Sequence, residues 1–336
     1  MSHFYSVILP TFGRPDEVRN FLNSMTHQET NDFEVIVVDG SHDDILHTVI
    51  NEFKDKTNLK YIQEKGLGAS ESRNLGCEKA KGDFLVFIDS DCVVPPDYFN
   101  KINAYLAGNP SIDAYGGPDA ADITFSPFQK AVNYAMTSML TTGGIRGKKK
   151  HIGKFQLRGF NMGIRKEAFF AVGGYTGMQV AEDIDLSMRL QKSGYRTALI
   201  PDAFVYHRRK ASFYKFYKQL FFHGKGRIDL HIKHGDALKW VHMLPSVFVL
   251  YLIAGIAMAF VFRPAFFIFL LSMAVYILAV FLDASIRNRS LLVGILSVIT
   301  SFELLIGYGL GVWKNIIYRM LLKRGQDSTK EQILKE

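Results

Sequence analysis

The chain has 336 residues and two cysteines, which allows one large domain or two modest ones but no disulfide framework or zinc site. Its formal net charge of +8 is unevenly distributed, because residues 206–336 hold 18 of the 40 Lys and Arg but only 7 of the 32 Asp and Glu. That basic segment is also the apolar one. It therefore indicates a partner membrane with anionic lipid and no nucleic acid.

The N-terminus, Met1–Tyr5, has no basic stretch followed by an apolar one. We therefore expect no signal peptide and a catalytic part in the reducing cytoplasm. From there to residue 90, strand and helix patterns alternate. Apolar runs predict strands at Phe4–Leu9, Phe33–Val38, Leu59–Ile62 and Phe84–Ile88, and amphipathic patterns predict helices at Pro15–Met25, Asp44–Phe53 and Ser70–Ala80, the last capped by Ser70. This order predicts an α/β fold with a mostly parallel sheet and helices on both faces.

The pattern is looser after residue 91. We expect a helix from Pro95 to Leu106, strands at Ile112–Gly117, Phe155–Ile164 and Ala203–Tyr206, and a helix at Ala181–Lys192. Between them, residues 141–154 are rich in glycine and basic residues, which is typical of a mobile loop.

The C-terminal part has membrane character. Ser212–His234 is dense in Phe, Tyr, Lys and His, and predicts a helix in the membrane interface, with an ordinary surface helix as the alternative. Two apolar runs, 244–262 and 264–282, are each long enough to span a bilayer and are separated only by Arg263. They predict a helical hairpin. A third apolar segment, 291–313, follows.

The third segment creates a conflict in topology. A full crossing would place Glu303 in the hydrocarbon and the basic tail, from Lys314 to Arg324, on the outside, against the positive-inside rule. We therefore expect a re-entrant or interfacial segment that is buried against protein, with three full spans as the alternative. Glycines 307, 309 and 311 would let the backbone bend or approach its neighbours closely.

Asp89-Ser90-Asp91 ends the apolar run Phe84–Ile88. Two carboxylates one residue apart at the carboxyl end of a strand suit Mn²⁺ or Mg²⁺, which prefer oxygen ligands. A solvated turn that ends a strand is the alternative for this triplet by itself. Cys92 follows directly, and we expect it to be a small buried apolar residue.

A set of short motifs supports the interpretation of Asp89-Ser90-Asp91 as a metal site, because the motifs occur in the same order in a known family. They are Val7-Ile8-Leu9-Pro10-Thr11, Val37-Val38-Asp39-Gly40-Ser41, Gly68 through Arg73-Asn74, Asp89-Ser90-Asp91, Gly116-Gly117, Gly159-Phe160-Asn161, and Glu182-Asp183 with Asp185. Over about residues 4–207 the chain resembles glycosyltransferase family 2. The resemblance implies a GT-A fold, which is Rossmann-like, and a nucleotide-diphosphate sugar as donor.

The resemblance also implies roles at the nucleotide. Pro10, Thr11, Asp39, Arg73 and Asp89 would bind the nucleotide, with Asp39 hydrogen-bonded to a base that is typically uracil. Asp39 could instead cap the following helix, and Arg73 could be an ordinary surface residue. The metal would be held by Asp91, with Asp89 on ribose or metal-bound water. His207 reaches the metal or the diphosphate in some relatives, and a histidine at lipid headgroups is its alternative.

The remaining roles concern the sugar and the acceptor. The resemblance makes Asp183 the general base that deprotonates the acceptor hydroxyl. Gly117, Asn161 and Glu182 would lie at the sugar or acceptor. For Glu182 and Asp185, a favourable position at a helix N-terminus is the alternative.

These observations predict a catalytic domain over 1–207, a basic interfacial helix and linker over 208–240, and an all-helical membrane region over 241–336. The predicted enzyme is a hexosyltransferase (EC 2.4) at the inner membrane, with its catalytic domain facing the cytoplasm. It would transfer one sugar, with a UDP-sugar favoured, with inversion to a hydroxyl of a lipid-linked or membrane-proximal glycan in envelope polysaccharide or glycolipid synthesis. A single transfer is favoured because the Gln-x-x-Arg-Trp motif of processive synthases is not found. The alternatives are a polyprenyl-monophosphate glycosyltransferase, whose acceptor is phosphate, and a non-catalytic membrane scaffold.

Overall fold

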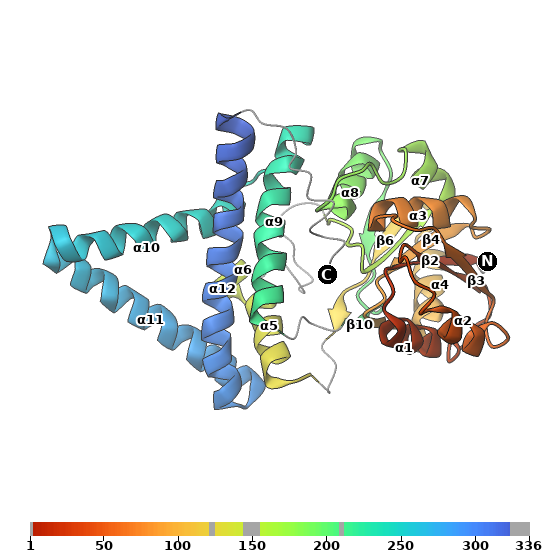
Figure 1. Cartoon of the computed structure of the whole chain (residues 1–336), viewed down its shortest axis with the longest axis horizontal. Helices are drawn as coiled ribbons and strands as arrows, with labels where there is room; N and C mark the ends of the chain where they lie inside the picture. The colour runs from red at the N-terminus through yellow and green to blue at the C-terminus, as the bar shows by residue number, and fades with distance from the viewer. Residues whose placement is uncertain (1–2, 121–124, 144–154, 208–211, 323–336) are drawn as a thin grey trace. The chain divides into compact units, whose positions relative to one another are not determined.

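The computed structural model describes residues 3–120, 125–143, 155–207 and 212–322, which form two compact units (Figure 1). The first unit, here called the sheet unit, contains the described residues up to 120 and 155–207. The second, the helical unit, contains 125–143 and 212–322. Most of the predicted loop at 141–154 and the cations at 208–210 lie outside the described residues.

A seven-stranded sheet organises the sheet unit. Its order is β3 (Leu59–Gln63), β2 (Phe33–Asp39), β1 (Tyr5–Thr11), β4 (Phe84–Ile88), β8 (Asn161–Arg165), β6 (Ala114–Gly116) and β9 (Thr197–Leu199). The first four strands are parallel to one another, and β8 is antiparallel to both strands beside it. The predicted α/β fold with a mostly parallel sheet is confirmed.

Helices cover both faces of this sheet. They are α1 (Pro15–Met25), α2 (His47–Phe53), α3 (Ala69–Glu78), α4 (Tyr98–Gly108), α7 (Lys166–Ala171) and α8 (Glu182–Lys192). Alternate residues of β1 enter different cores, because successive side chains of a strand point to opposite faces. Val7 packs in the cluster that includes Phe21 of α1, and Ile8 packs in the cluster that includes Cys77 of α3. Strands covered on both faces are apolar at nearly every position.

A three-stranded sheet lies at the carboxyl end of β4. It consists of β5 (Cys92–Val93), β10 (Val205–His207) and β7 (Asp119–Ala120). The antiparallel pairing of β10 with β5 places His207 opposite Cys92. This small sheet therefore brings the end of the catalytic sequence back to the Asp89–Asp91 segment.

Local details differ from the sequence expectations at several element ends, as at the starts of α3 and β8. Helix α3 is capped by Gly68, whose backbone N–H donates to the Glu71 carboxylate over 2.8 Å, so the predicted cap at Ser70 is wrong. Strand β8 begins at Asn161, later than the predicted start at Phe155.

The helical unit contains α5 (Pro127–Thr137), α6 (Met139–Thr142), α9 (Phe213–His234), a 3₁₀ turn (Trp240–Met243), α10 (Leu244–Val261), α11 (Arg263–Asn288), α12 (Leu291–Asn315) and a π-helical turn (Ile316–Leu321). Three helical stretches are long and apolar enough to cross a membrane: Trp240–Val261, Arg263–Asn288 and Leu291–Leu321. Helix α12 is continuous from Leu291 to Asn315, so a re-entrant turn within it is excluded and that part of the expectation is wrong.

Helix α5 joins the helical unit although it lies within the predicted catalytic domain. The Thr300 hydroxyl of α12 donates to the Ala131 carbonyl over 3.1 Å, and the Tyr134 hydroxyl donates to Asp283 of α11 over 2.8 Å. A segment that lies between two parts of the sheet unit in the sequence therefore completes the helical unit.

Candidate active site

The carboxyl ends of β1, β2 and β4 form one edge of the sheet, because these strands are parallel neighbours. Thr11 lies opposite Asp39 in the β1–β2 register, and Asp89 follows β4 directly. The Thr11 hydroxyl is buried and has no hydrogen-bond partner among the described residues. With half-buried Pro10 beside it, Thr11 offers a polar group that a ligand at this edge would satisfy.

Asp39 is fully buried and strongly engaged within the protein. One carboxylate oxygen accepts from the backbone N–H groups of Gly13 and Ser41, at 3.2 and 3.0 Å. The other accepts from the hydroxyls of Ser41 and Tyr61, at 2.7 and 3.1 Å. A carboxylate has about four acceptor positions, so a base would have to displace one of these donors. The N-cap position of α2 is Leu46, which makes no side-chain cap bond, and Asp39 does not cap this helix.

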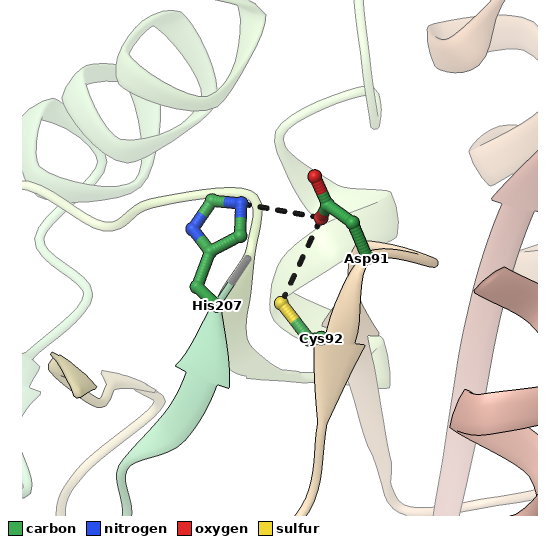
Figure 2. Close-up of side chains that lie close together, drawn as sticks. All are labelled: Asp91, Cys92 and His207. Atoms are coloured by element: carbon green, nitrogen blue, oxygen red, sulfur yellow. Dashed lines mark hydrogen bonds and ion pairs between the residues drawn. The ribbon is translucent and has the colours of Figure 1, made fainter. Parts of the chain in front are cut away.

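Asp91, Cys92 and His207 form the group of candidate metal ligands that the described residues contain (Figure 2). The His207 Nε2 atom lies 3.2 Å from the Asp91 carboxylate, and the Cys92 Sγ atom lies 4.0 Å from the same oxygen. The ring of Phe160 stacks on the His207 ring at a centroid distance of 5.0 Å. Both Asp91 and His207 keep some exposure, whereas Cys92 is buried.

This donor set fits a divalent cation of the Mn²⁺ or Mg²⁺ class. Burial raises the pKa of the Cys92 thiol well above its usual value, and a thiol is a softer donor than Mn²⁺ or Mg²⁺ prefers. The remaining donors are a carboxylate and an imidazole. Carboxylate oxygen suits both ions, and imidazole suits the transition metals better than Mg²⁺.

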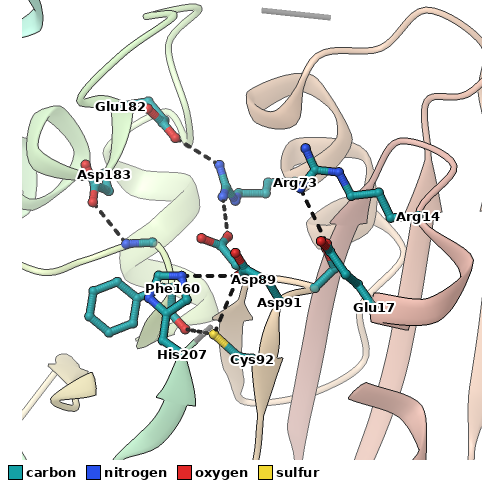
Figure 3. Close-up of polar contacts among 12 residues, drawn as sticks. Arg14, Glu17, Arg73, Asp89, Asp91, Cys92, Phe160, Glu182, Asp183 and His207 are labelled. Carbon is teal, nitrogen blue, oxygen red and sulfur yellow. Dashed lines mark hydrogen bonds and ion pairs between the residues drawn. The ribbon is translucent and has the colours of Figure 1, made fainter. Parts of the chain in front are cut away.

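Arg73 connects two acids from distant parts of the chain (Figure 3). One Nη atom donates to Asp89 over 2.9 Å, and the other donates to Glu182 over 3.0 Å. The guanidinium is buried and lies 5.3 Å from the centroid of the Tyr175 ring. Arg73 is therefore not an ordinary surface residue, and its contact with the nucleotide stays a prediction. It ties the acid after β4 to the first turn of α8.

Two features set the first turn of α8 apart. Burial raises the pKa of Glu182 to about 7, while Arg73 acts in the opposite direction and Asp183 adds to the increase. Ala181, which precedes it, has φ of 62° and lies in the left-handed region that residues with a Cβ rarely adopt. Backbone of this kind costs about 1–3 kcal/mol and is concentrated at functional sites.

Asp183 is held by backbone groups. One oxygen accepts from the Gly159 N–H over 3.0 Å, and the other accepts from the Ile184 N–H over 2.8 Å. Each oxygen keeps a further acceptor position. The carboxylate is thus oriented but still able to take a proton.

Asp185, two residues later, has a different environment. It is fully buried, accepts from Thr176 over 2.8 Å and pairs with Arg189 at 2.9 Å. Its carboxylate therefore stabilises the fold of α8.

Gly117 and Asn161, expected at the sugar, are buried in contacts between loops and strands. A Cβ on Gly117 would overlap the backbone of Ala203. The Asn161 amide donates to the Ala203 carbonyl over 2.8 Å and accepts from the Tyr98 hydroxyl over 2.6 Å. Both residues are buried in the structure, and their contact with the sugar or acceptor stays a prediction.

Sequence reasoning missed the residues that support the acids. Tyr175 packs beneath Arg73, and the Asn74 side chain fixes it by bonding to its backbone N–H and carbonyl, both at 2.9 Å. Phe160 aligns the His207 ring. The motifs contained Asn74 and Phe160, but nothing in their spacing indicated these partners.

The comparisons with known proteins identify the family of the chain. Residues 6–173 match the model of glycosyl transferase family 2. An uncharacterized glycosyltransferase of Haemophilus influenzae is 30% identical over 213 residues, which are 62% of this chain and 70% of that protein. The succinoglycan biosynthesis protein ExoA of Rhizobium meliloti is 31% identical over 169 residues, which are 49% of this chain and 50% of ExoA.

A solved structure shares the fold over most of the chain. The mannosyltransferase PcManGT from Pyrobaculum calidifontis, in complex with GDP-Man and Mn²⁺, superposes with a TM-score of 0.66 and covers 94% of this chain and 88% of its own, at 16% sequence identity. The sheet with acids at its strand ends, the family match and this fold lead to one conclusion. The chain belongs to glycosyl transferase family 2 and is a nucleotide-sugar-dependent glycosyltransferase (EC 2.4) with a GT-A-like sheet and long apolar helices at its C-terminus.

Proposed function

We propose that the enzyme transfers a single sugar, with inversion, from a nucleotide-diphosphate sugar to a hydroxyl of a lipid-linked or membrane-proximal glycan. The observation that carries this proposal is the arrangement of acids at one sheet edge. Asp91 and His207 lie close enough together to hold one cation, and Asp183 is an oriented carboxylate with free acceptor positions. Such a pair of functions is what displacement of a diphosphate by a hydroxyl requires.

The donor would bind at the ends of β1, β2 and β4. Thr11 offers its buried hydroxyl to the nucleotide, and Asp91 and His207 would hold Mn²⁺ or Mg²⁺ at the diphosphate. The cation supplies positive charge that stabilises the departing nucleoside diphosphate. The internal hydrogen bonds of Asp39 occupy the acceptor positions of its carboxylate. Asp39 therefore gives no support to a preference for uracil over other bases.

The reaction is one displacement at the anomeric carbon. Asp183 accepts the proton of the acceptor hydroxyl, the acceptor oxygen forms a bond to the anomeric carbon, and the bond from that carbon to the diphosphate oxygen breaks with its electron pair on the diphosphate. Because attack and departure occur on opposite faces, the configuration inverts. Arg73 keeps Asp89 and Glu182 fixed around this centre.

The acceptor class is inferred from the helical unit. Its exposed apolar helices favour an acceptor that is itself at a membrane, such as a lipid-linked glycan of envelope polysaccharide synthesis. The cations near helix ends, among them Arg287, Arg289 and Lys314, favour a cytoplasmic catalytic face.

Ligand binding and metal dependence test the proposal together. The full chain in detergent is warmed with UDP-, GDP- and dTDP-sugars, each with Mn²⁺ or with EDTA. We expect one donor class to raise the unfolding midpoint, because a ligand that binds only the folded state stabilises it. EDTA should remove that stabilisation and abolish donor turnover.

Asp91→Ala is the decisive variant. It should lose metal-dependent donor binding and transfer, because the diphosphate loses its cation. Asp97→Ala removes a carboxylate in the same unit whose partner is Lys101 in an exposed pair, and should behave as wild type. Full transfer by Asp91→Ala would disprove the site. Absence of donor turnover with every donor and Mn²⁺ would favour the scaffold alternative.

A further inference from the structure

The helical unit has a geometry that its hydropathy alone does not reveal. The α10–α11 hairpin contacts α12 through its two open ends, and midway along α11 the ring of Tyr276 lies 5.8 Å, between centroids, from the ring of Phe302 of α12. At one end, the Trp313 Nε1–H donates to the Ser246 carbonyl over 3.1 Å, and Gly309 lies against Pro245. At the other end, Gly294 lies against Ser285 of α11.

The three helices therefore form a triangle. Gly294 and Gly309 are about 22 Å apart along α12, and the two hairpin helices reach about 22 and 32 Å from their contacts to the tip, at 1.5 Å per residue. Sides of these lengths place α10 roughly perpendicular to α12 and α11 at roughly 45° to it. Figure 1 shows α10 and α11 leaving α12 at separate points and meeting at a tip away from it. The hairpin helices and α12 therefore cannot all be aligned with one membrane normal.

The surface of the hairpin is apolar and exposed. At its tip, Phe260 and Val261 are 89% and 77% exposed, and further apolar side chains are exposed along both helices. No charged residue occurs from Leu244 to Phe262 or from Pro264 to Leu282. Arg263 lies at the tip, where its side chain can reach headgroups on the far side. Lipid hydrocarbon matches this surface in chemistry and in length.

Helix α12 has different surroundings, because α9 runs parallel to it. Four successive contacts keep the same offset: Tyr217 with Gly307, Phe221 with Gly311, Lys225 with Asn315, and Asp229 with Arg319. If α12 crossed a bilayer, this stretch of α9 would accompany it, together with Lys218, Lys225, Arg227 and Asp229. Charged side chains in hydrocarbon are costly.

The first half of α12 is covered as well. Helix α5 packs there through Thr300 and Ala131. The large apolar side chains that α12 leaves exposed follow helical spacing along one stripe, and they are Leu291, Leu292, Ile295, Ile299 and Leu310. A single apolar stripe is typical of a helix that lies on a membrane surface.

We propose that only the α10–α11 hairpin crosses the bilayer, while α12 lies with α9 along the membrane surface as the base of the hairpin. The chain then has two membrane crossings, and the tail after α12 is on the same side as the sheet unit. The basic side chains of α9 lie at lipid phosphates. This inference rests on the helical unit alone and does not depend on the proposed reaction.

Single cysteines in the full chain test the topology. Cysteines replace Asn109 in the sheet unit, Arg263 at the hairpin tip and Ser328 in the tail. Both native cysteines are buried, so the unmodified chain serves as the blank. A membrane-impermeant maleimide is applied to sealed cells and to opened cells. We expect Asn109→Cys and Ser328→Cys to share one side and Arg263→Cys to lie on the other.

Two results would overturn the proposal. Opposite sides for Asn109→Cys and Ser328→Cys would mean that α12 crosses. One side for all three would mean that the hairpin does not cross and is covered by something else, such as a second copy of the chain.

Depth measurements add an independent test. Bimane-labelled Leu292→Cys, Ile299→Cys and Leu310→Cys are compared for quenching by lipids brominated at known depths. Along a helix on the surface all three should report one shallow depth. Along a crossing helix, position 299 should be markedly deeper than the other two. Ile253→Cys and Ile256→Cys in the hairpin provide the deep reference.

Discussion

At the residue scale, Arg73 is the centre of the site. Its planar guanidinium reaches Asp89 with one nitrogen and Glu182 with another, so one side chain fixes the acid after β4 relative to α8. The pair Glu182–Asp183 opens α8, so this tie also limits the movement of the carboxylate proposed as the base. A lysine carries its charge at one point and cannot span two acids in this way.

Arg73→Lys should therefore impair turnover while keeping the charge. We expect kcat to fall by on the order of 10–100-fold, because misplacing reacting groups by about 1 Å can have such an effect. Donor KM should change less than kcat. The matched control is Arg19→Lys, where the arginine also pairs through two nitrogens, with Glu52, but on the exposed surface. Equal activity of both variants would show that the tie has no catalytic role.

Asp183→Asn tests whether Asp183, and not a neighbouring acid, is the general base. The amide is nearly isosteric but takes no proton at neutral pH, so turnover should fall by on the order of 10²–10⁴ with donor binding retained. The control is Asp185→Asn, which replaces a carboxylate that pairs with Arg189. It should lower the stability of the fold without this selective loss of kcat. Normal turnover of Asp183→Asn at saturating donor would favour a phosphate acceptor, which needs no strong base.

The motifs predicted which residues meet but not what each one does. Parallel strand ends made the gathering of Thr11, Asp39 and Asp89 predictable. The donors to Asp39 come partly from Tyr61 on a neighbouring strand, and such contacts are not visible in a linear pattern. In the same way, Asn161 matches a motif although its amide is occupied by Tyr98 and Ala203.

At the element scale, the glycines of α12 allow close helix packing and do not bend the helix. A Cβ on Gly311 would overlap the Phe221 carbonyl of α9, and a Cβ on Gly309 would lie 2.5 Å from the Pro245 carbonyl of α10. Gly224 of α9 makes the reciprocal approach to Tyr308. Small residues let backbones approach in this way.

Gly311→Ala should separate α9 from α12. We expect a loss of roughly 1–3 kcal/mol, the usual effect of overpacking, seen as a lower unfolding midpoint by circular dichroism in detergent. Gly108→Ala is the control, because Gly108 ends α4 and a Cβ there meets nothing within 4 Å. The control should be neutral or slightly stabilising. A harmless Gly311→Ala would mean that α9 and α12 are not closely packed in solution.

The long elements were predictable because each one carries its own pattern. The runs that became β1, β2 and β4 are mostly apolar, and α1 was predicted with its observed bounds, Pro15–Met25. The small sheet was not predictable in full. β5 and β7 have two residues each, and their pairing with β10 depends on contacts between segments far apart in the chain.

At the scale of the whole molecule, the chain order does not follow the division into units. Helix α5 comes from the middle of the catalytic sequence, yet Val132, Ala135 and Met136 are buried with Phe216 of α9 and Leu304 of α12. Its amphipathic pattern shows that one face must be covered, but no local signal indicates which part of the chain covers it. The expected boundary at residue 207 therefore leaves this face without its partners.

A fragment of residues 1–207 tests this directly. Because removal of α9 and α12 uncovers the apolar face of α5, the fragment should aggregate on gel filtration without detergent. A matched fragment, in which residues 125–143 are replaced by the same number of Gly and Ser, should be monomeric and should still be stabilised by the donor with Mn²⁺, since every residue assigned to the site lies in the sheet unit. If the unmodified fragment is monomeric without detergent, α5 is not bound to the helical unit as the structure describes. If both fragments aggregate, the sheet unit depends on more of the chain than α5 and its partners.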